Sequence, residues 1–184
     1  MDTDVTPTGA THARTTDHVV VMGVAGSGKT TIAALLADRL GLDLAEADEF
    51  HPEANIAKMS AGEPLDDDDR RPWLEAIRDW LDERTDAGRS AVVTCSALRR
   101  SYRDVLRTAH GHVRFLHLDG TGEVLARRMT GRTGHFMPPE LLPSQLATLE
   151  PLDDDEDGLV VDITTDPATI VADAVAWLAP TRAR

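Results

Sequence analysis

The octapeptide GVAGSGKT at residues 23–30 constrains this chain most, because it fits G-x-x-x-x-G-K-[S/T] at every fixed position. An apolar run, HVVVMG at 18–23, precedes it, and TTIAALLADRLG at 30–41 follows with helical periodicity. A strand, a glycine-rich loop and a helix in this order form a phosphate-binding P-loop. The chain is therefore predicted to bind a nucleoside triphosphate and to fold as an α/β protein.

The residue types of this loop match the chemistry of a triphosphate. Glycines let the backbone wrap closely around phosphate oxygens and direct N–H groups at them. The Lys29 ammonium is expected to reach the β and γ phosphates, and the Thr30 hydroxyl to bind Mg²⁺. The ATP-binding residues expected here are Gly23, Ala25, Gly26, Ser27, Gly28, Lys29, Thr30 and Thr31.

Short apolar runs alternate with amphipathic segments along the chain. Strands are predicted at 18–23, 42–48, 91–97, 113–119 and 158–164. Helices are predicted at 30–41, 53–61, 65–88, 99–109, 122–132, 139–151 and 166–179, the sixth interrupted or capped near Pro143. This order indicates a P-loop NTPase three-layer sandwich, with a five-stranded, mainly parallel sheet and helices on both faces.

The same pattern predicts how the chain is divided. Residues 17–179 are expected to form a single P-loop kinase domain with a small lid at about 127–140. The small, polar and aperiodic residues 1–16 predict a disordered tail, and 180–184 a loose C-terminal tail.

Composition limits the partners. The net charge of −13 repels nucleic acid and anionic membranes, so neither is expected as a partner. No apolar run approaches the length that spans a membrane, and the first residues lack a signal-peptide core, so a cytoplasmic location is expected. Cys95 is the single cysteine, which excludes an intrachain disulfide.

Acidic and other polar residues gather at the second predicted strand, in EADEFHPEANIAKM at 46–59. Glu46 and Asp48 are two residues apart, and strand side chains alternate with a period of two. We therefore expect both carboxylates on one face beside the P-loop, one for the Mg²⁺ shell and one for a substrate hydroxyl. Asp119 and Asp162, each near the end of an apolar run, are alternatives for the metal.

Four segments together resemble the small P-loop gluconokinase family: GVAGSGKTT, EADEFHPEANIAKMSAGEPLDDDDRRPWL, CSALRRSYRD and GRTGHFMPPELLPSQLATLEP. They follow the family's order with similar spacing, over roughly residues 18–165. More distantly, the chain resembles shikimate kinase. The resemblance implies ATP-dependent phosphorylation of D-gluconate at its 6-hydroxyl, with ATP and Mg²⁺ as cofactors, and a homodimer.

A linear polyhydroxy acid needs hydrogen-bonding groups for its hydroxyls and cations for its carboxylate. The segments after the second and third strands open at the same sheet edge as the P-loop, so their polar groups can converge. Asp48 is expected to bond the attacking hydroxyl, and Glu46 to join Thr30 at Mg²⁺ through water. The expected substrate-binding residues are Asp48, His51, Lys58, Arg70, Arg99, Arg103 and His135.

The segment RRMTGRTGHFMPP at 127–139 is predicted to close over ATP as a lid. Arg128 and Arg132 are expected to meet the phosphates as arginine fingers in cis, and with Lys29 and Asp48 they form the expected catalytic set. A Gly/Pro turn with solvated arginines is the alternative interpretation of this segment.

Two other functions remain open from the sequence. Another small-molecule P-loop kinase, of the shikimate or sugar-acid type, would share the loop and differ in its acceptor. A non-catalytic nucleotide-binding regulator would keep the loop without turnover, and the joint presence of Lys29, Thr30, Asp48 and the lid arginines argues against it.

Overall fold

The computed structural model describes residues 16–130 and 142–179. Five strands form one sheet, and every neighbouring pair is parallel. They are β1 (Asp17–Met22), β2 (Asp43–Glu46), β3 (Ala91–Thr94), β4 (His112–Asp119) and β5 (Gly158–Asp162), in the spatial order β2-β3-β1-β4-β5. The predicted fold class, a five-stranded parallel P-loop sandwich, is confirmed.

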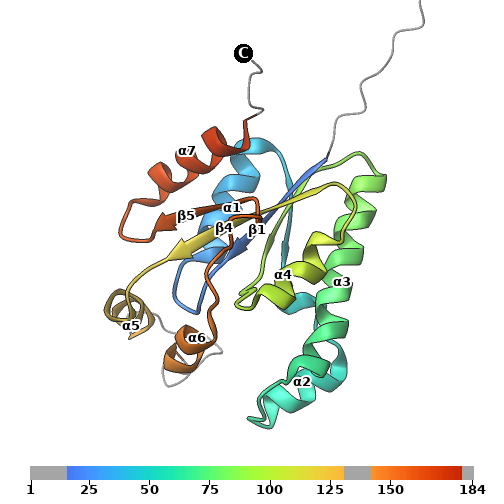
Figure 1. The fold of residues 1–184 in the computed structure, drawn as a ribbon, viewed down its shortest axis with the longest axis vertical. Coiled ribbons are helices and arrows are strands. Elements are labelled where there is room, and N and C mark those ends of the chain that lie inside the picture. The colour runs from blue at the N-terminus through green and yellow to red at the C-terminus, as the bar shows by residue number, and fades with distance from the viewer. Residues whose placement is uncertain (1–15, 131–141, 180–184) are drawn as a thin grey trace, which may run out of the picture.

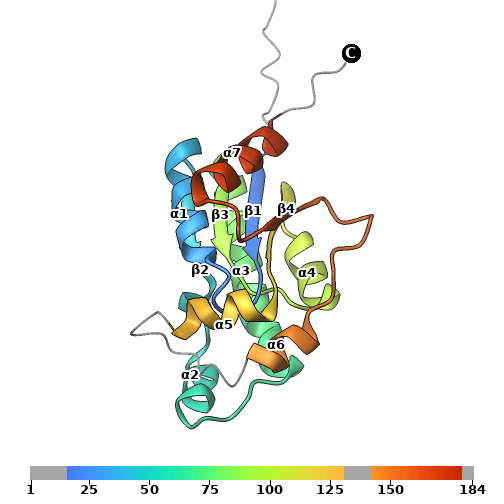
Figure 2. The same ribbon diagram turned by 90° about the vertical axis from the view of Figure 1, so that its left-hand side faces the viewer.

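Helices cover both faces of the sheet, with α1 and α7 on one side and α3 and α4 on the other (Figures 1 and 2). The α-helices are α1 (Lys29–Leu40), α2 (Glu53–Ser60), α3 (Asp67–Asp86), α4 (Arg100–Arg107), α5 (Gly122–Thr130), α6 (Leu142–Thr148) and α7 (Pro167–Leu178). A short 3₁₀ helix, η1 (Ala47–Phe50), joins β2 to α2. None of the helices described combines the length and the apolar character needed to cross a membrane.

The core has two layers because the central strands are buried on both faces. Along β1, Val19 and Val21 pack toward α1 and α7, whereas Val20 and Met22 pack toward α3 and α4. Continuous apolar runs are typical of parallel strands covered on both sides. This arrangement fixes the carboxyl end of β1, where the P-loop begins.

Local signals explain where two helices start. Asp66 caps α3 by accepting from the Asp69 N–H, and Asp69 accepts in return from the Asp66 N–H. The Asp166 carboxylate accepts from the Thr169 N–H, and Pro167 occupies the first turn of α7. Pro143 likewise lies at the start of α6 and does not interrupt it.

The structure corrects two boundaries. β2 ends at Glu46, so Asp48 lies in η1, and the strand-period argument for Glu46 and Asp48 was wrong. The tail prediction was wrong for Thr16, which is buried and whose carbonyl accepts from the His112 N–H at 2.9 Å. Residues 1–15, 131–141 and 180–184, which include most of the predicted lid and both tails, lie outside the described residues.

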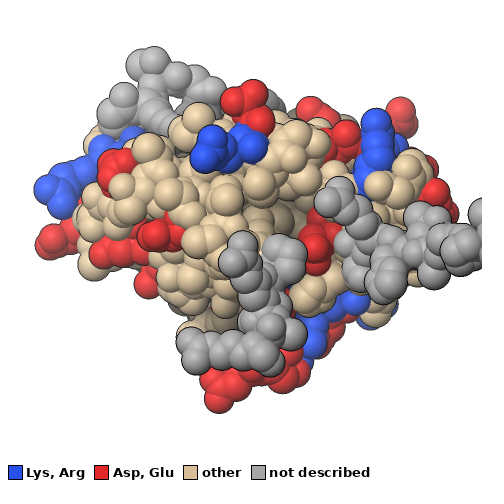
Figure 3. Space-filling model, turned by 90° about the horizontal axis from the view of Figure 1, so that it is seen from above, with Lys and Arg blue, Asp and Glu red and all other residues tan. Residues whose placement is uncertain are grey.

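Charge is dispersed over the face seen in Figure 3. Lys and Arg side chains there are separated from one another by acidic and uncharged residues. On this face the described residues form no continuous basic patch.

Candidate functional site

The P-loop has the backbone shape that its glycines predict. Gly23, Gly26 and Gly28 have φ angles of 142°, 80° and 97°, a region that side chains disfavour. A Cβ added at Gly23 would also lie 2.8 Å from the Leu118 carbonyl oxygen. The loop therefore follows its tight path only with glycine at these positions, and α1 begins directly after it.

Lys29 folds back over this loop, and its Nζ donates to the Val24 carbonyl at 3.1 Å. Burial lowers the pKa of Lys29, while the nearby Cys95, Asp48 and Glu46 act in the opposite direction. Both carboxylates therefore lie within electrostatic reach of the ammonium. The convergence of these acids on a substrate at the P-loop stays a prediction, and its strand-based reasoning was wrong.

A pocket opens beside the loop, where α1, α5 and the connection from β5 to α7 meet. Its lining residues include Gly26, Ser27, Gly28, Thr31, Arg128, Ile163, Thr165 and Pro167. The Arg128 guanidinium donates to the Ile163 carbonyl, and its Nη1 would lie 3.7 Å from a Cβ added at Gly28. Arg128 therefore lies on the pocket side of the P-loop, where a nucleotide could reach it.

Two oxygen donors suit a hard cation near the phosphates. Thr30 is exposed at the first turn of α1, and Glu46 is half-buried at the end of β2, where its carboxylate accepts from the Thr94 hydroxyl. Among the described residues, no cluster of three or more His, Cys, Asp or Glu side chains could bind a metal by itself. Mg²⁺ in kinases usually takes one or two protein ligands and completes its shell with phosphates and water, which fits this sparse set.

On the acceptor side, Trp73 of α3 positions η1. Its indole Nε1 donates to the Ala47 carbonyl at 2.6 Å, and its ring stacks on His51 with centroids 4.5 Å apart. Asp48 is exposed on η1 between these two contacts, and burial lowers the pKa of His51. An apolar residue in a helical stripe gives no sign in the sequence that its side chain also supports a site, so this role of the Trp73 indole N–H appears only in the structure.

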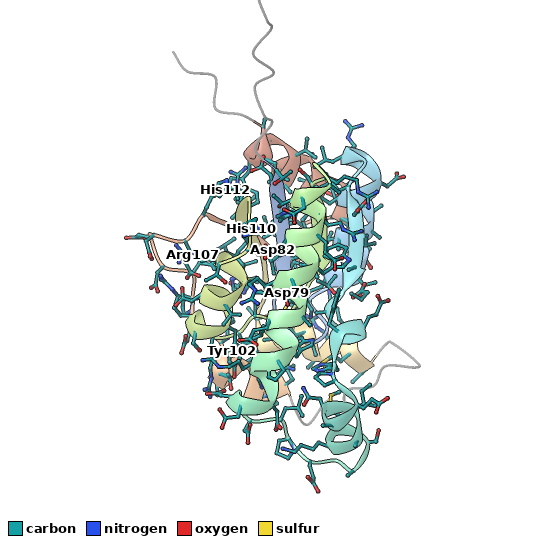
Figure 4. All side chains as sticks on the ribbon, turned by 90° about the vertical axis from the view of Figure 1, so that its right-hand side faces the viewer. Asp79, Asp82, Tyr102, Arg107, His110 and His112 are labelled. Carbon is teal, nitrogen blue, oxygen red and sulfur yellow. The ribbon has the colours of Figure 1, made fainter. Side chains whose placement is uncertain are left out.

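Two arginines flank Tyr102 of α4, which Figure 4 labels beside the lower part of α3, below His110 and His112. The guanidinium carbons of Arg70 and Arg99 lie 5.7 and 5.8 Å from its ring centroid. Arg99 also pairs with Asp67 at 2.9 Å, and the Tyr102 hydroxyl donates to the same carboxylate. In contrast, Arg70 forms no ion pair within the described part of the chain, and it lowers the pKa of His51 from nearby.

Lys58 lies at the outer edge of this region. Its ammonium pairs with Asp69 at 2.7 Å, and this hydrogen bond raises the pKa of Lys58. Asn55 is buried beside it and donates to the Asp69 carbonyl, so it joins α2 to α3. Both residues thus have partners inside the protein, and Lys58 is half-exposed.

Arg103 is a correction to the predicted substrate site. Its side chain is fully buried, and all five N–H groups donate to protein acceptors: the Glu156 carboxylate and the carbonyls of Ala97, Glu150 and Pro151. No donor is left for a substrate, so the substrate-binding prediction for Arg103 was wrong. Arg132 and His135 lie outside the described residues.

Comparisons with known proteins agree with this geometry. Residues 19–152 match the model of a family described as an AAA domain. A gluconokinase of Gluconobacter oxydans is 51% identical over 85% of this chain and 88% of its own. The chain belongs to the gluconokinase family.

Solved structures give the same result for this member of the gluconokinase family. A sugar kinase of Janibacter sp. is similar with a TM-score of 0.84 and 58% identity, over 89% of this chain and 94% of its own. A gluconokinase of Sinorhizobium meliloti follows with a TM-score of 0.79 and 48% identity, over 90% and 93% of the two chains. The chain is thus a P-loop kinase, as its motifs predict.

Proposed function

We propose that this protein transfers the γ-phosphoryl group of ATP to the 6-hydroxyl of D-gluconate, giving 6-phospho-D-gluconate. The observation that carries the proposal is a P-loop whose Lys29 ammonium lies over the loop, with Asp48 and Glu46 within its electrostatic reach. A cation for the transferring phosphoryl group and an acid for the attacking hydroxyl are the two charges that this reaction needs. The gluconokinases among the relatives support the choice of acceptor.

The nucleotide is proposed to lie along the P-loop. Its base end would occupy the pocket near Thr165 and Pro167, and its phosphates would receive backbone N–H groups from Gly26 to Thr31. Lys29 and Arg128 would offset the charge that develops on the transferring group. Thr30, and Glu46 through water, would hold Mg²⁺, which would supply positive charge to offset that of the phosphates.

Gluconate is proposed to lie between η1, α2 and α3. The exposed Asp48 carboxylate would accept the proton of the 6-hydroxyl as its oxygen attacks phosphorus in line. Arg70 is the favoured partner for the substrate carboxylate, because it makes no ion pair with the described residues, whereas Lys58 and Arg99 each have an acid. His51, fixed by its stack on Trp73, is proposed to bond a hydroxyl of the sugar acid chain.

The remaining assignments are also proposals. Arg132 and His135 are proposed to close the site from the lid, and the working form to be a cytoplasmic homodimer without nucleic-acid or membrane partners.

Turnover of ATP to ADP with Mg²⁺ tests the proposal, with D-gluconate, shikimate, glucose and no acceptor in parallel. We expect ADP release with gluconate alone, and phosphorus NMR of the product should show a phosphomonoester on carbon 6. If shikimate or glucose supported turnover instead, the protein would still be a kinase, but D-gluconate would not be its acceptor. Tight ATP binding without turnover on any acceptor would favour the alternative function, a non-catalytic nucleotide-binding regulator.

A further inference from the structure

The side chain of Gln145 reaches the P-loop from α6. Its Oε1 accepts a hydrogen bond from the Ala25 backbone N–H at 2.7 Å, across 120 positions of sequence. Ala25 lies in the first half of the loop, ahead of the helix N-terminus that begins at Lys29. The bond therefore gives the Ala25 peptide a fixed partner outside the loop and outside α1.

Two observations indicate which end of a triphosphate this part would face. The Lys29 ammonium, which in a P-loop reaches the β and γ phosphates, lies 3.1 Å from the carbonyl of Val24, next to Ala25. The pocket, in contrast, is lined by loop residues from Gly26 onward, and neither Val24 nor Ala25 is part of its lining. Ala25 is thus at the γ-phosphate end, and the pocket is at the base end.

The helix that carries Gln145 is itself well anchored. Leu142 is buried in the core layer of α1 and α7, and Leu146 packs against the same layer. Just past the helix, the Glu150 N–H donates to the Leu98 carbonyl at 2.7 Å. The backbone of Gln145 is thus attached to the core before and after this residue. Its side chain can therefore hold the Ala25 peptide in one position.

We propose that Gln145 is a positioning residue for phosphoryl transfer, which sets the γ-phosphate end of the P-loop through the Ala25 N–H. The inference rests on the proposed use of ATP. Without the acceptor oxygen, the Ala25 peptide can rotate, and the γ-phosphate loses its aligned contacts. The α and β phosphates keep theirs, because the start of α1 supplies them.

Gln145→Met tests this, because methionine is close to glutamine in length and lacks the acceptor. Calorimetry should show that the Kd of a non-hydrolysable ATP analogue rises about five- to tenfold, the usual effect of one lost hydrogen bond. The Kd of ADP should change less than about twofold. Thr148→Val is the matched control: it loses a side-chain bond on the same helix, to Ser144, and should leave both Kd values unchanged.

Two further measurements separate positioning from a structural role. In Gln145→Met the Ala25 amide should exchange faster with solvent in an NMR experiment, while the melting temperature stays close to that of the unmodified protein. Equal weakening of ATP-analogue and ADP binding, or no change in either, would overturn the inference while leaving the proposed function intact. Failure of the unmodified protein to bind the ATP analogue would overturn both.

Discussion

Arginines serve opposite purposes in two neighbouring regions of this molecule. In the first region, Arg103 of α4 is fully buried and donates all five N–H groups to fixed acceptors. In the second, Arg70 of α3 lies against the Tyr102 ring and makes no ion pair with the described residues. A guanidinium whose donors are all used stabilises the fold, whereas one that retains donors can bind an anion.

This contrast bears on how a chain of net charge −13 could bind anionic ligands. Most arginines of the described part have acids beside them, as in the Arg100 group with Asp104, Asp153 and Asp155. By our proposal, the local field that attracts ATP and gluconate therefore depends on the few cations that form no ion pair with the described residues, chiefly Lys29, Arg70 and Arg128. Substitutions of an arginine with an acidic partner and of one without it should therefore have different effects, and these test this view.

The largest effect is expected at an acid within electrostatic reach of Lys29. Asp48→Asn should lower kcat about 10²- to 10⁴-fold, because the amide cannot accept the proton of the attacking hydroxyl. The melting temperature should stay constant, since Asp48 is exposed on η1. Glu49→Gln, one residue further along the same helix, should retain nearly full activity in the same ADP-release assay. A kcat within threefold of normal in Asp48→Asn would remove Asp48 from the mechanism.

The buried arginine should give the next largest effect, on stability. Arg103→Met leaves the Glu156 carboxylate buried without its partner, so unfolding should cost about 3–5 kcal/mol less. Denaturant titration measures this difference. Arg107→Met, on the same helix, removes only partly exposed contacts and should cost under about 1 kcal/mol. If Arg103→Met instead raised the gluconate KM at unchanged stability, the two regions would not differ as described.

Arg70→Met should act on binding without a comparable loss of stability. Losing a charged hydrogen-bond donor to the substrate carboxylate should raise the gluconate KM about 10- to 100-fold. The ATP KM should be unaffected, because Arg70 lies on the acceptor side. Arg71→Met is the control, because Arg71 is exposed and forms only a weak surface pair with Glu75, at 3.9 Å. An equal rise of the gluconate KM in Arg70→Met and Arg71→Met would show that Arg70 does not bind the substrate carboxylate.

Much of this architecture could be predicted from the sequence, because its signals are local. The P-loop, the alternation of elements and the cap at Asp166 all lie within short windows. The roles of Arg103 and Gln145 could not be predicted, because their partners, Glu156 and Ala25, are 53 and 120 positions away. Arg103 follows β3 just as a substrate-binding arginine would, and only tertiary packing shows that its donors are already used.

The smallest effect concerns the amino end of the sheet, where His18 is fully buried on β1. Burial lowers the pKa of His18, which Asp17 and Asp82 only partly oppose, so the folded state favours the neutral ring bonded to Thr85 at 2.7 Å. The unfolded chain takes up a proton near pH 6.5, whereas the folded chain resists it until a lower pH. Stability should therefore fall as pH decreases from about 6.5 through the folded pKa. Denaturant titrations at pH 7.5 and 5.5 should show a smaller loss in His18→Gln, whose amide can still bond Thr85, than in the exposed-site control His110→Gln. An identical pH dependence in both variants would mean that His18 does not drive the acid sensitivity of this end.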